Sequence, residues 1–219
     1  MKRILITGLF VGLLLVLLVG AVFALKGPAS TQTAAPADTT ANLAPTATDS
    51  YNFIALPLDS TDSFSYTASG LANYVGSSVS AVIKWDATNQ QYVTYTPGGP
   101  GDFALETGGA YFLLLDSTAD NVLSFVGDVP PQGSISFSLV KDTGSGCKYN
   151  AISIPLDQGQ ITMASDLANS IGGVDAVIKW DATNQQYVTY TPGGPGDFAV
   201  SIGYPYFVCL NSSAPSTWP

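Results

Sequence analysis

The chain contains one long block of residues twice, without a single change. The block AVIKWDATNQQYVTYTPGGPGDFA occupies residues 81–104 and again residues 176–199. Weaker similarity extends the repeat on both sides, since YNFIALPLD begins at Tyr51 and YNAISIPLD begins at Tyr149. Self-similarity of this kind indicates that one structural unit has been duplicated. We therefore predict two homologous modules in tandem.

Each copy has the pattern of a β module with one short helix. The runs 81–85 and 92–96 flank a turn rich in Asp and Asn, which predicts a hairpin. Alternation along the first run places Ile83 and Trp85 on one face of the sheet, and Ser69 and its equivalent Ser165 are positioned to cap a short helix. We expect a mainly β protein with two tandem β-sandwich or barrel-like subdomains, which follow an N-terminal hydrophobic helix and a disordered linker.

The first residues have the pattern of an export signal. Lys2 and Arg3 precede an apolar run over residues 4–25, which as a helix would span about 33 Å and could cross a hydrocarbon core of about 30 Å. Small residues also permit cleavage after Ala24. A cleaved signal peptide and a retained transmembrane anchor are both compatible with the pattern. In either case the positive charges stay inside, and everything after Lys26 lies outside the cytoplasm.

The segment after the leader has few large apolar side chains. Its Ala, Thr and Pro content cannot bury enough surface to offset the cost of ordering, which predicts a disordered linker. The predicted organisation has five parts: 1–25 signal peptide or transmembrane anchor, 26–50 linker, 51–116 first β module, 117–148 β bridge and 149–219 second β module.

Composition excludes several classes of chemistry. The chain has no histidine, so it lacks an imidazole for acid–base catalysis or metal binding, and its only arginine is Arg3. The net charge of −9 without a basic cluster argues against nucleic acid as a partner. Charged residues make up only 11% of the chain, against about 25% in an average soluble domain. A surface built from small polar residues suits an exported β-rich protein.

The two cysteines are predicted to form a disulfide. Cys147 precedes the first strand of the second copy, and Cys209 lies in its last strand. Two cysteines in an exported chain most often pair, and two free buried thiols are the alternative. The equivalent positions of the first copy hold Asp49 and Leu114, so the bond would belong to the second copy alone.

The repeated acidic and hydroxyl residues could be read as ligands or as turn residues. Asp86 and Asp102 could offer oxygens to Ca²⁺ or act as a glycosidase pair, and Lys84 beside a serine could form a nucleophilic pair. Ordinary turn chemistry accounts for the same residues. We therefore expect no catalytic residue, no metal site and no cofactor. The full set of repeated oxygen donors is Asp86, Thr88, Asn89 and Asp102, with Asp181, Thr183, Asn184 and Asp197.

Aromatic residues of the repeated hairpins are the candidate ligand contacts. Trp85 and Tyr92, with Trp180 and Tyr187, could stack on sugar rings, although aromatic residues on a hairpin more often belong to the core. Trp85 directly opposite Tyr92 would also stabilise the sheet by about 0.2–1 kcal/mol.

The frame YN-x-I-x-(L/I)-PL, followed by IKWD and YF, occurs in both copies. It resembles duplicated, uncharacterised β-rich modules of exported bacterial surface proteins, and the resemblance covers Tyr51 to Pro219. It implies a surface-displayed binding or structural role without catalytic residues. We expect a non-enzymatic structural or adhesion module at the extracytoplasmic face of the membrane, on the cell surface or secreted.

Two other functions remain open from the sequence. One is an accessory subunit of a membrane complex, whose retained leader helix packs through the small residues Gly8 and Gly12. The other is a saccharide-binding module. The expected partners are therefore the membrane, if the leader is retained, and other surface or membrane proteins, or saccharide.

Overall fold

The computed structural model describes residues 37–43, 49–116 and 122–219, which lie within one unit of the chain, Ala34–Pro219. The predicted signal peptide or anchor at 1–25 lies outside the described residues. Among the helices that are described, none combines the length and the apolar character needed to cross a membrane.

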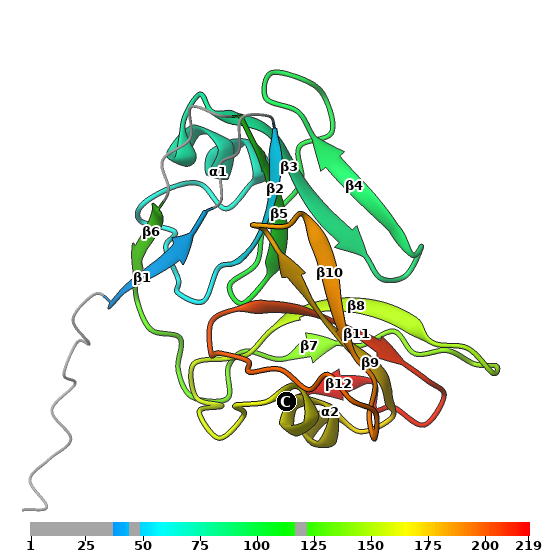
Figure 1. Ribbon diagram of the computed structural model, residues 1–219. Coiled ribbons are helices and arrows are strands. Elements are labelled where there is room, and N and C mark those ends of the chain that lie inside the picture. The colour runs from blue at the N-terminus through cyan, green and yellow to red at the C-terminus, as the bar shows by residue number, and fades with distance from the viewer. Residues whose placement is uncertain (1–36, 44–48, 117–121) are drawn as a thin grey trace, which may run out of the picture. The chain divides into compact units, whose positions relative to one another are not determined.

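The two copies of the repeat form two antiparallel sheets with the same strand order (Figure 1). The first sheet has the order β2 (Ser50–Ala55), β5 (Ala110–Leu115), β3 (Val79–Asp86) and β4 (Gln91–Tyr95). The second has the order β8 (Lys148–Ser153), β11 (Pro205–Leu210), β9 (Val174–Asp181) and β10 (Gln186–Tyr190). The protein is mainly β, as predicted, but neither four-stranded sheet closes into a barrel.

Each sheet carries one short helix, α1 (Ala68–Val75) or α2 (Ala164–Ile171). The hydroxyl of Thr67 accepts the hydrogen bond that begins α1, so the predicted cap, Ser69, lies two residues too far along and is part of the helix. Gly76 ends α1 with a φ of 110°. A residue with a side chain rarely adopts this conformation, which explains the glycine.

In each module the segments that precede and follow the four-stranded sheet in the chain pair with each other as a separate two-stranded ribbon. In the first module β1 (Ala37–Asn42) pairs with β6 (Val122–Gly127), and in the second β7 (Phe137–Ser138) pairs with β12 (Thr217–Trp218). The strand β1 falls within the predicted disordered linker. Its composition favours disorder, but β6 offers it a backbone partner along its whole length.

The predicted bridge 117–148 is divided between the modules. Leu123 and Phe125 of β6 are buried in the first core, with Leu43 from the end of β1. Leu139, just after β7, is buried in the second core with Trp218. The strands of the bridge pair with distant segments of the chain, β6 with β1 and β7 with β12, which the predicted boundaries did not anticipate.

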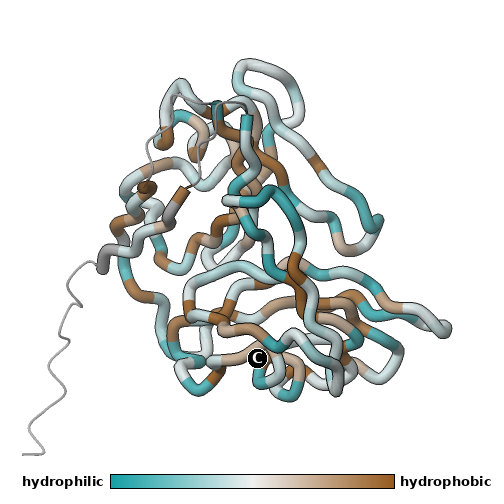
Figure 2. Tube along the Cα trace, in the orientation of Figure 1, coloured by the Kyte–Doolittle hydropathy of each residue, from teal (hydrophilic) through white to brown (hydrophobic). Residues whose placement is uncertain are grey.

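The faces of the two sheets that point away from the helices pack against each other. Along β5, Leu113 and Leu115 point to the helix side, whereas Phe112 belongs to a third apolar cluster. Phe207 of β11 lies in the same cluster, with the rings of Phe112 and Phe207 6.2 Å apart. This apolar cluster therefore lies between the two modules. Figure 2 shows the hydrophobic residues recurring along the strands of both sheets.

The predicted disulfide is confirmed. Cys147 and Cys209 are bonded, with their Cα atoms 5.3 Å apart. The bond encloses most of the second module.

Candidate functional site

The two repeated hairpins hold each other's modules through matching hydrogen bonds. The indole Nε1 of Trp85 donates to the backbone oxygen of Tyr149 at 2.8 Å. Its counterpart Trp180 donates to the backbone oxygen of Tyr51, also at 2.8 Å. Each hairpin therefore binds a strand of the other module, since Tyr149 lies in β8 and Tyr51 lies in β2.

A glutamine in each hairpin turn completes this contact. Gln90 accepts from the Tyr149 nitrogen at 2.9 Å and donates to the Tyr149 oxygen at 2.9 Å. Gln185 does the same with Tyr51, at 2.8 and 3.0 Å. The side-chain amide thus satisfies both backbone groups of one residue, as a neighbouring strand would. We call these glutamine and tryptophan bonds together the clasp.

The hairpin turn forces each glutamine into an unusual backbone conformation. Gln90 has a φ of 53° and Gln185 a φ of 52°, in the left-handed region that costs an L-residue roughly 1–2 kcal/mol. Within the turn, Nε2 of Gln90 also donates to the oxygen of Ala87 at 2.6 Å. The Asp86 carboxylate accepts from the backbone nitrogens of Thr88 and Asn89, both at 3.0 Å. These hydrogen bonds within the turn orient the glutamine side chain toward the other module.

The clasp is isologous, because each module contributes the same groups to the contact. Tyr92 and Tyr187 are equivalent residues, and their hydroxyls lie 2.7 Å apart, which places this pair on the approximate two-fold axis. Burial raises the pKa of Tyr92, and the hydrogen bond with Tyr187 raises it further. The Tyr92 hydroxyl therefore stays protonated at neutral pH.

Two equivalent hollows flank the tyrosine pair. The Tyr51 hollow has a volume of about 310 Å³ and the Tyr149 hollow about 370 Å³. Both fall near the lower end of the range of about 300–1,000 Å³ for small-molecule sites. The Tyr51 hollow is lined by Tyr51, Ile83, Tyr92, Thr94, Phe112, Trp180 and Tyr187. The Tyr149 hollow is lined by the equivalent set, Tyr149, Ile178, Tyr187, Thr189, Phe207, Trp85 and Tyr92.

Each hollow is formed by aromatic rings that stand at a steep angle to one another, and it is open to solvent. In the Tyr51 hollow the Trp180 ring stands almost perpendicular to Phe112, at 85° and 5.6 Å between centroids. The tyrosine of each opening is partly exposed, 42% for Tyr51 and 41% for Tyr149, and the shared pair Tyr92 and Tyr187 is exposed at 47% and 49%. Among the residues that the structure describes, no charged residue lines either hollow. Such a surface offers apolar ring faces edged by hydroxyl groups.

The structure brings together all four aromatics that the sequence marks as candidate ligand contacts. Trp85 lies opposite Tyr92, as predicted, and the two rings are 4.9 Å apart. The alternative, that these residues belong to the core, holds in part, because both tryptophans are half-buried between the sheets. Their equivalents pair in the same way, at 4.8 Å.

The aspartates considered as calcium ligands or as a glycosidase pair accept hydrogen bonds from nearby turn and helix residues. Hydrogen bonds from Asn89 hold the pKa of Asp86 below its usual value, and bonds from Asn184 do the same for Asp181. Asp102 instead accepts from the backbone nitrogen and hydroxyl of Ser69, at the start of α1. Its equivalent Asp197 also accepts from the start of a helix. Among the described residues, no group of three or more Cys, Asp or Glu side chains is placed to hold a metal ion.

The repeated lysines cover aromatic rings. The Nζ atom of Lys84 lies 4.7 Å from the centre of the Phe103 ring. Lys179 lies 4.6 Å from the centre of Phe198. Cation–π contacts of this kind stabilise by about 0.5–1 kcal/mol at exposed sites and give the lysines a structural role.

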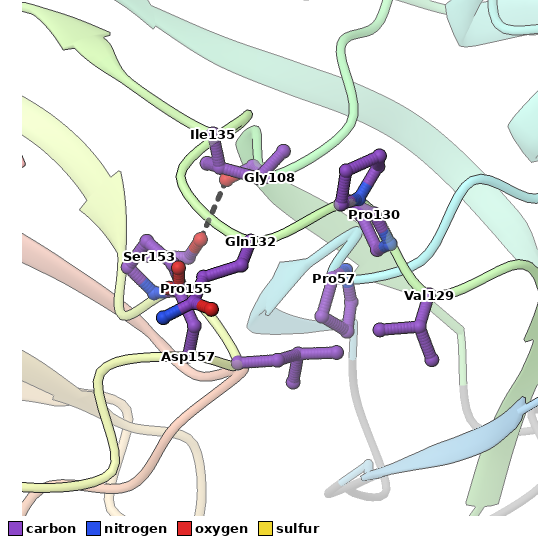
Figure 3. A pocket seen from close by; sticks show the side chains of 11 residues that line it. Pro57, Gly108, Val129, Pro130, Gln132, Ile135, Ser153, Pro155 and Asp157 are labelled. Atoms are coloured by element: carbon purple, nitrogen blue, oxygen red, sulfur yellow. Dashed lines mark hydrogen bonds between the residues drawn. The ribbon is translucent and has the colours of Figure 1, made fainter. Parts of the chain in front are cut away.

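A further hollow, of about 240 Å³, lies where the modules meet away from the clasp (Figure 3). Pro57 and Pro155, which follow the first strand of each module, both line it. Ser153 donates to the oxygen of Gly108 at 2.7 Å across the contact. This hollow mixes proline rings with backbone, and we assign it to the packing of the modules.

Sequence reasoning missed Gln90 and Gln185, and it treated Tyr51 and Tyr149 only as markers of the repeat. The signal was the turn DATNQQ itself, which is unchanged in both copies although a turn alone tolerates many sequences.

The fold and site define a duplicated β protein with an isologous contact between its halves. Searches against family models, curated proteins and solved structures found no match to the chain.

Proposed function

We propose that the protein is an exported, surface-displayed module with a structural or adhesive role and no enzymatic activity. The observation that carries this proposal is the group of four tyrosines around the clasp, each more than two-fifths exposed. Aromatic side chains gathered at a surface commonly mark a contact with another molecule. The four are Tyr51, Tyr92, Tyr149 and Tyr187.

The roles of the carboxylates support a non-enzymatic function. A glycosidase of the usual kind needs one carboxylic acid with a raised pKa. The pKa values of Asp86 and Asp102 are instead lowered by hydrogen bonds, from Asn89 and from Ser69. Both are therefore ionised and engaged by the fold.

The disulfide supports an extracytoplasmic location. Disulfides persist in oxidising compartments and are rare in the cytosol, where thiols are kept reduced. The bond between Cys147 and Cys209 therefore agrees with export by the hydrophobic leader.

The test uses intact cells that produce the full chain. A protease that cannot cross the membrane should digest the protein, and attachment of the cells to their natural surface should fall when the four tyrosines are replaced by alanine. Tyr204→Ala is the matched control, because Tyr204 is 45% exposed and lies outside both hollows. Protection from the protease, with Cys147 reactive to a thiol reagent, would refute the proposal.

Saccharide binding is the form of adhesion that one specific observation favours. The four aromatics predicted as sugar contacts line two uncharged hollows. Aromatic rings with a few hydroxyl groups suit a ligand that is apolar on its faces and polar at its rim.

A further inference from the structure

We propose that the two hollows are equivalent sites for uncharged pyranose rings, and that one protein molecule joins two separate glycan chains. This inference rests on the proposed adhesive function and names its ligand class. It also assigns a purpose to the isologous arrangement of the modules.

The lining selects an uncharged ligand with flat apolar faces. Within the described ranges, neither hollow has a charged side chain that could pair with a phosphate, sulfate or carboxylate. The side-chain hydroxyls of Tyr51 and Thr94 make no hydrogen bond within the described part of the chain, and each can both donate and accept. A pyranose with equatorial hydroxyls presents C–H groups on its faces and hydroxyls around its edge. It therefore matches aromatic walls with hydroxyl groups at their margin.

Proline-rich peptides also bind aromatic grooves, but the clasp makes them the weaker match. Such a peptide presents carbonyl oxygens, for which an indole N–H is a fixed donor. Here Trp85 and Trp180 already donate their only N–H groups to the Tyr149 and Tyr51 backbones. The remaining polar groups of the hollows are hydroxyls, which suit the hydroxyls of a sugar.

The symmetry of the sites determines how many chains they bind. A glycan chain has a direction, from its non-reducing to its reducing end. Two sites related by a two-fold axis meet a single straight chain in opposite directions, so they cannot make the same contacts with it. Two separate chains, one in each hollow and running in opposite directions, make equivalent contacts.

Neither hollow belongs to one module. The Tyr51 hollow takes Trp180 and Tyr187 from the second module, and the Tyr149 hollow takes Trp85 and Tyr92 from the first. Each repeated hairpin therefore supplies walls to both sites. A change confined to one hairpin alters both hollows, which is consistent with identical hairpins in the two copies.

Calorimetric titration of the full exported chain tests the ligand class. The probes are cellohexaose and chitohexaose, both neutral and with equatorial substituents, with hexagalacturonate and decaproline for comparison. We expect at least one neutral hexasaccharide to bind with two ligands per protein. Binding of neither neutral probe, binding of only the charged or peptide probe, or a stoichiometry of one would overturn the inference.

Single-hollow variants test the joining of two chains. Tyr51→Ala removes one wall of one hollow but keeps the backbone oxygen that the clasp uses. It should reduce the stoichiometry from two to one, as should Tyr149→Ala, and the double variant should not bind. Thr94→Val keeps the shape and should weaken one site about three- to tenfold by removing a hydroxyl. Tyr204→Ala is the control for an exposed tyrosine elsewhere.

Beads coated with the bound glycan give the second readout. The unaltered protein should aggregate the beads, whereas each single tyrosine variant should bind them without aggregation. Aggregation by both single variants would refute a two-chain contact. If no glycan binds but cells still attach through the four tyrosines, this inference fails while the proposed function stands. A cytosolic protein would refute the proposed function whatever the titrations show.

Discussion

The clasp glutamines can be tested separately from any ligand. In Gln90→Ala, two hydrogen bonds to Tyr149 and one to the Ala87 oxygen are lost. Each is worth about 0.5–1.5 kcal/mol net, so the free energy of unfolding should fall by about 1.5–4.5 kcal/mol. The lower half of this range is expected, because Tyr149 is partly exposed and water can replace the lost partners. Gln185→Ala should cost the same, since its bonds are equivalent.

A glycine substitution separates the lost hydrogen bonds from the backbone conformation. Gln90→Gly loses the same bonds, but glycine adopts a φ of 53° without the penalty that alanine keeps. After the greater entropy of glycine in the unfolded chain is subtracted, Gln90→Gly should be about 0.5–1 kcal/mol more stable than Gln90→Ala.

The assay is equilibrium unfolding in urea followed by tryptophan fluorescence, since Trp85 and Trp180 report on the contact between the modules. Gln91→Ala is the matched control: Gln91 is the next residue, it is exposed, and its side chain makes no hydrogen bond within the described residues. Its effect should stay within about 0.5 kcal/mol. Equal losses in Gln90→Ala and Gln91→Ala, or a glycine variant less stable than the alanine variant, would refute the role assigned to the clasp.

Three further predictions concern the disulfide and the titrating groups. Replacing Cys147 and Cys209 by serine should lower the free energy of unfolding by at most about 4 kcal/mol, because the bond spans 62 residues; no change in urea unfolding would contradict this. Hydrogen bonds lower the pKa of Asp86 in the folded protein, so its stabilising effect is present above its ordinary pKa and is lost as the pH falls through the folded pKa. Asp86→Asn should therefore be less stable than the unaltered protein at pH 7, with the difference shrinking below about pH 4 in thermal unfolding; a difference independent of pH would count against it. The pKa of Tyr92 is raised in the folded protein, so its contribution to the free energy of unfolding is complete below about pH 10 and is lost as the pH rises through the folded pKa. Tyr92→Phe, which removes the bond to Tyr187, should therefore lose less stability in alkali than the unaltered protein. Identical profiles of stability against alkaline pH for the two proteins would argue against the pair.

The features that depend on local pattern could be predicted from the sequence. The alternation that placed Ile83 and Trp85 on one face is observed, because both belong to the cluster between the sheets. The hairpin register that set Trp85 opposite Tyr92 is also observed. These follow from the two-residue period of a strand and from the turn residues.

The features that depend on contacts between distant segments could not be predicted. The clasp joins Gln90 to the backbone of Tyr149. Almost every residue has the same backbone groups, so the sequence does not reveal which residue Gln90 contacts. Strand β1 was missed because four of its six residues are Ala, Asp or Asn, which are depleted in strands, and because its partner β6 lies about 80 residues away. The helix cap was misplaced from Thr67 to Ser69 because both residues are suitable caps and only the backbone decides between them.

The terminal ribbons have a mechanical consequence for a tethered protein. Ala37 pairs with Gly127 at the same end of the antiparallel ribbon β1–β6, so tension applied across the first module would separate the ribbon one residue pair at a time. In the second module the ribbon β7–β12 lies outside the loop that Cys147 and Cys209 close, so it can separate too, but the covalent bond keeps the loop closed and withholds about 200 Å of chain, at roughly 3.4 Å for each residue. Under load the whole first module would lengthen, whereas the second would lengthen only outside its disulfide loop, although their sheets are built alike.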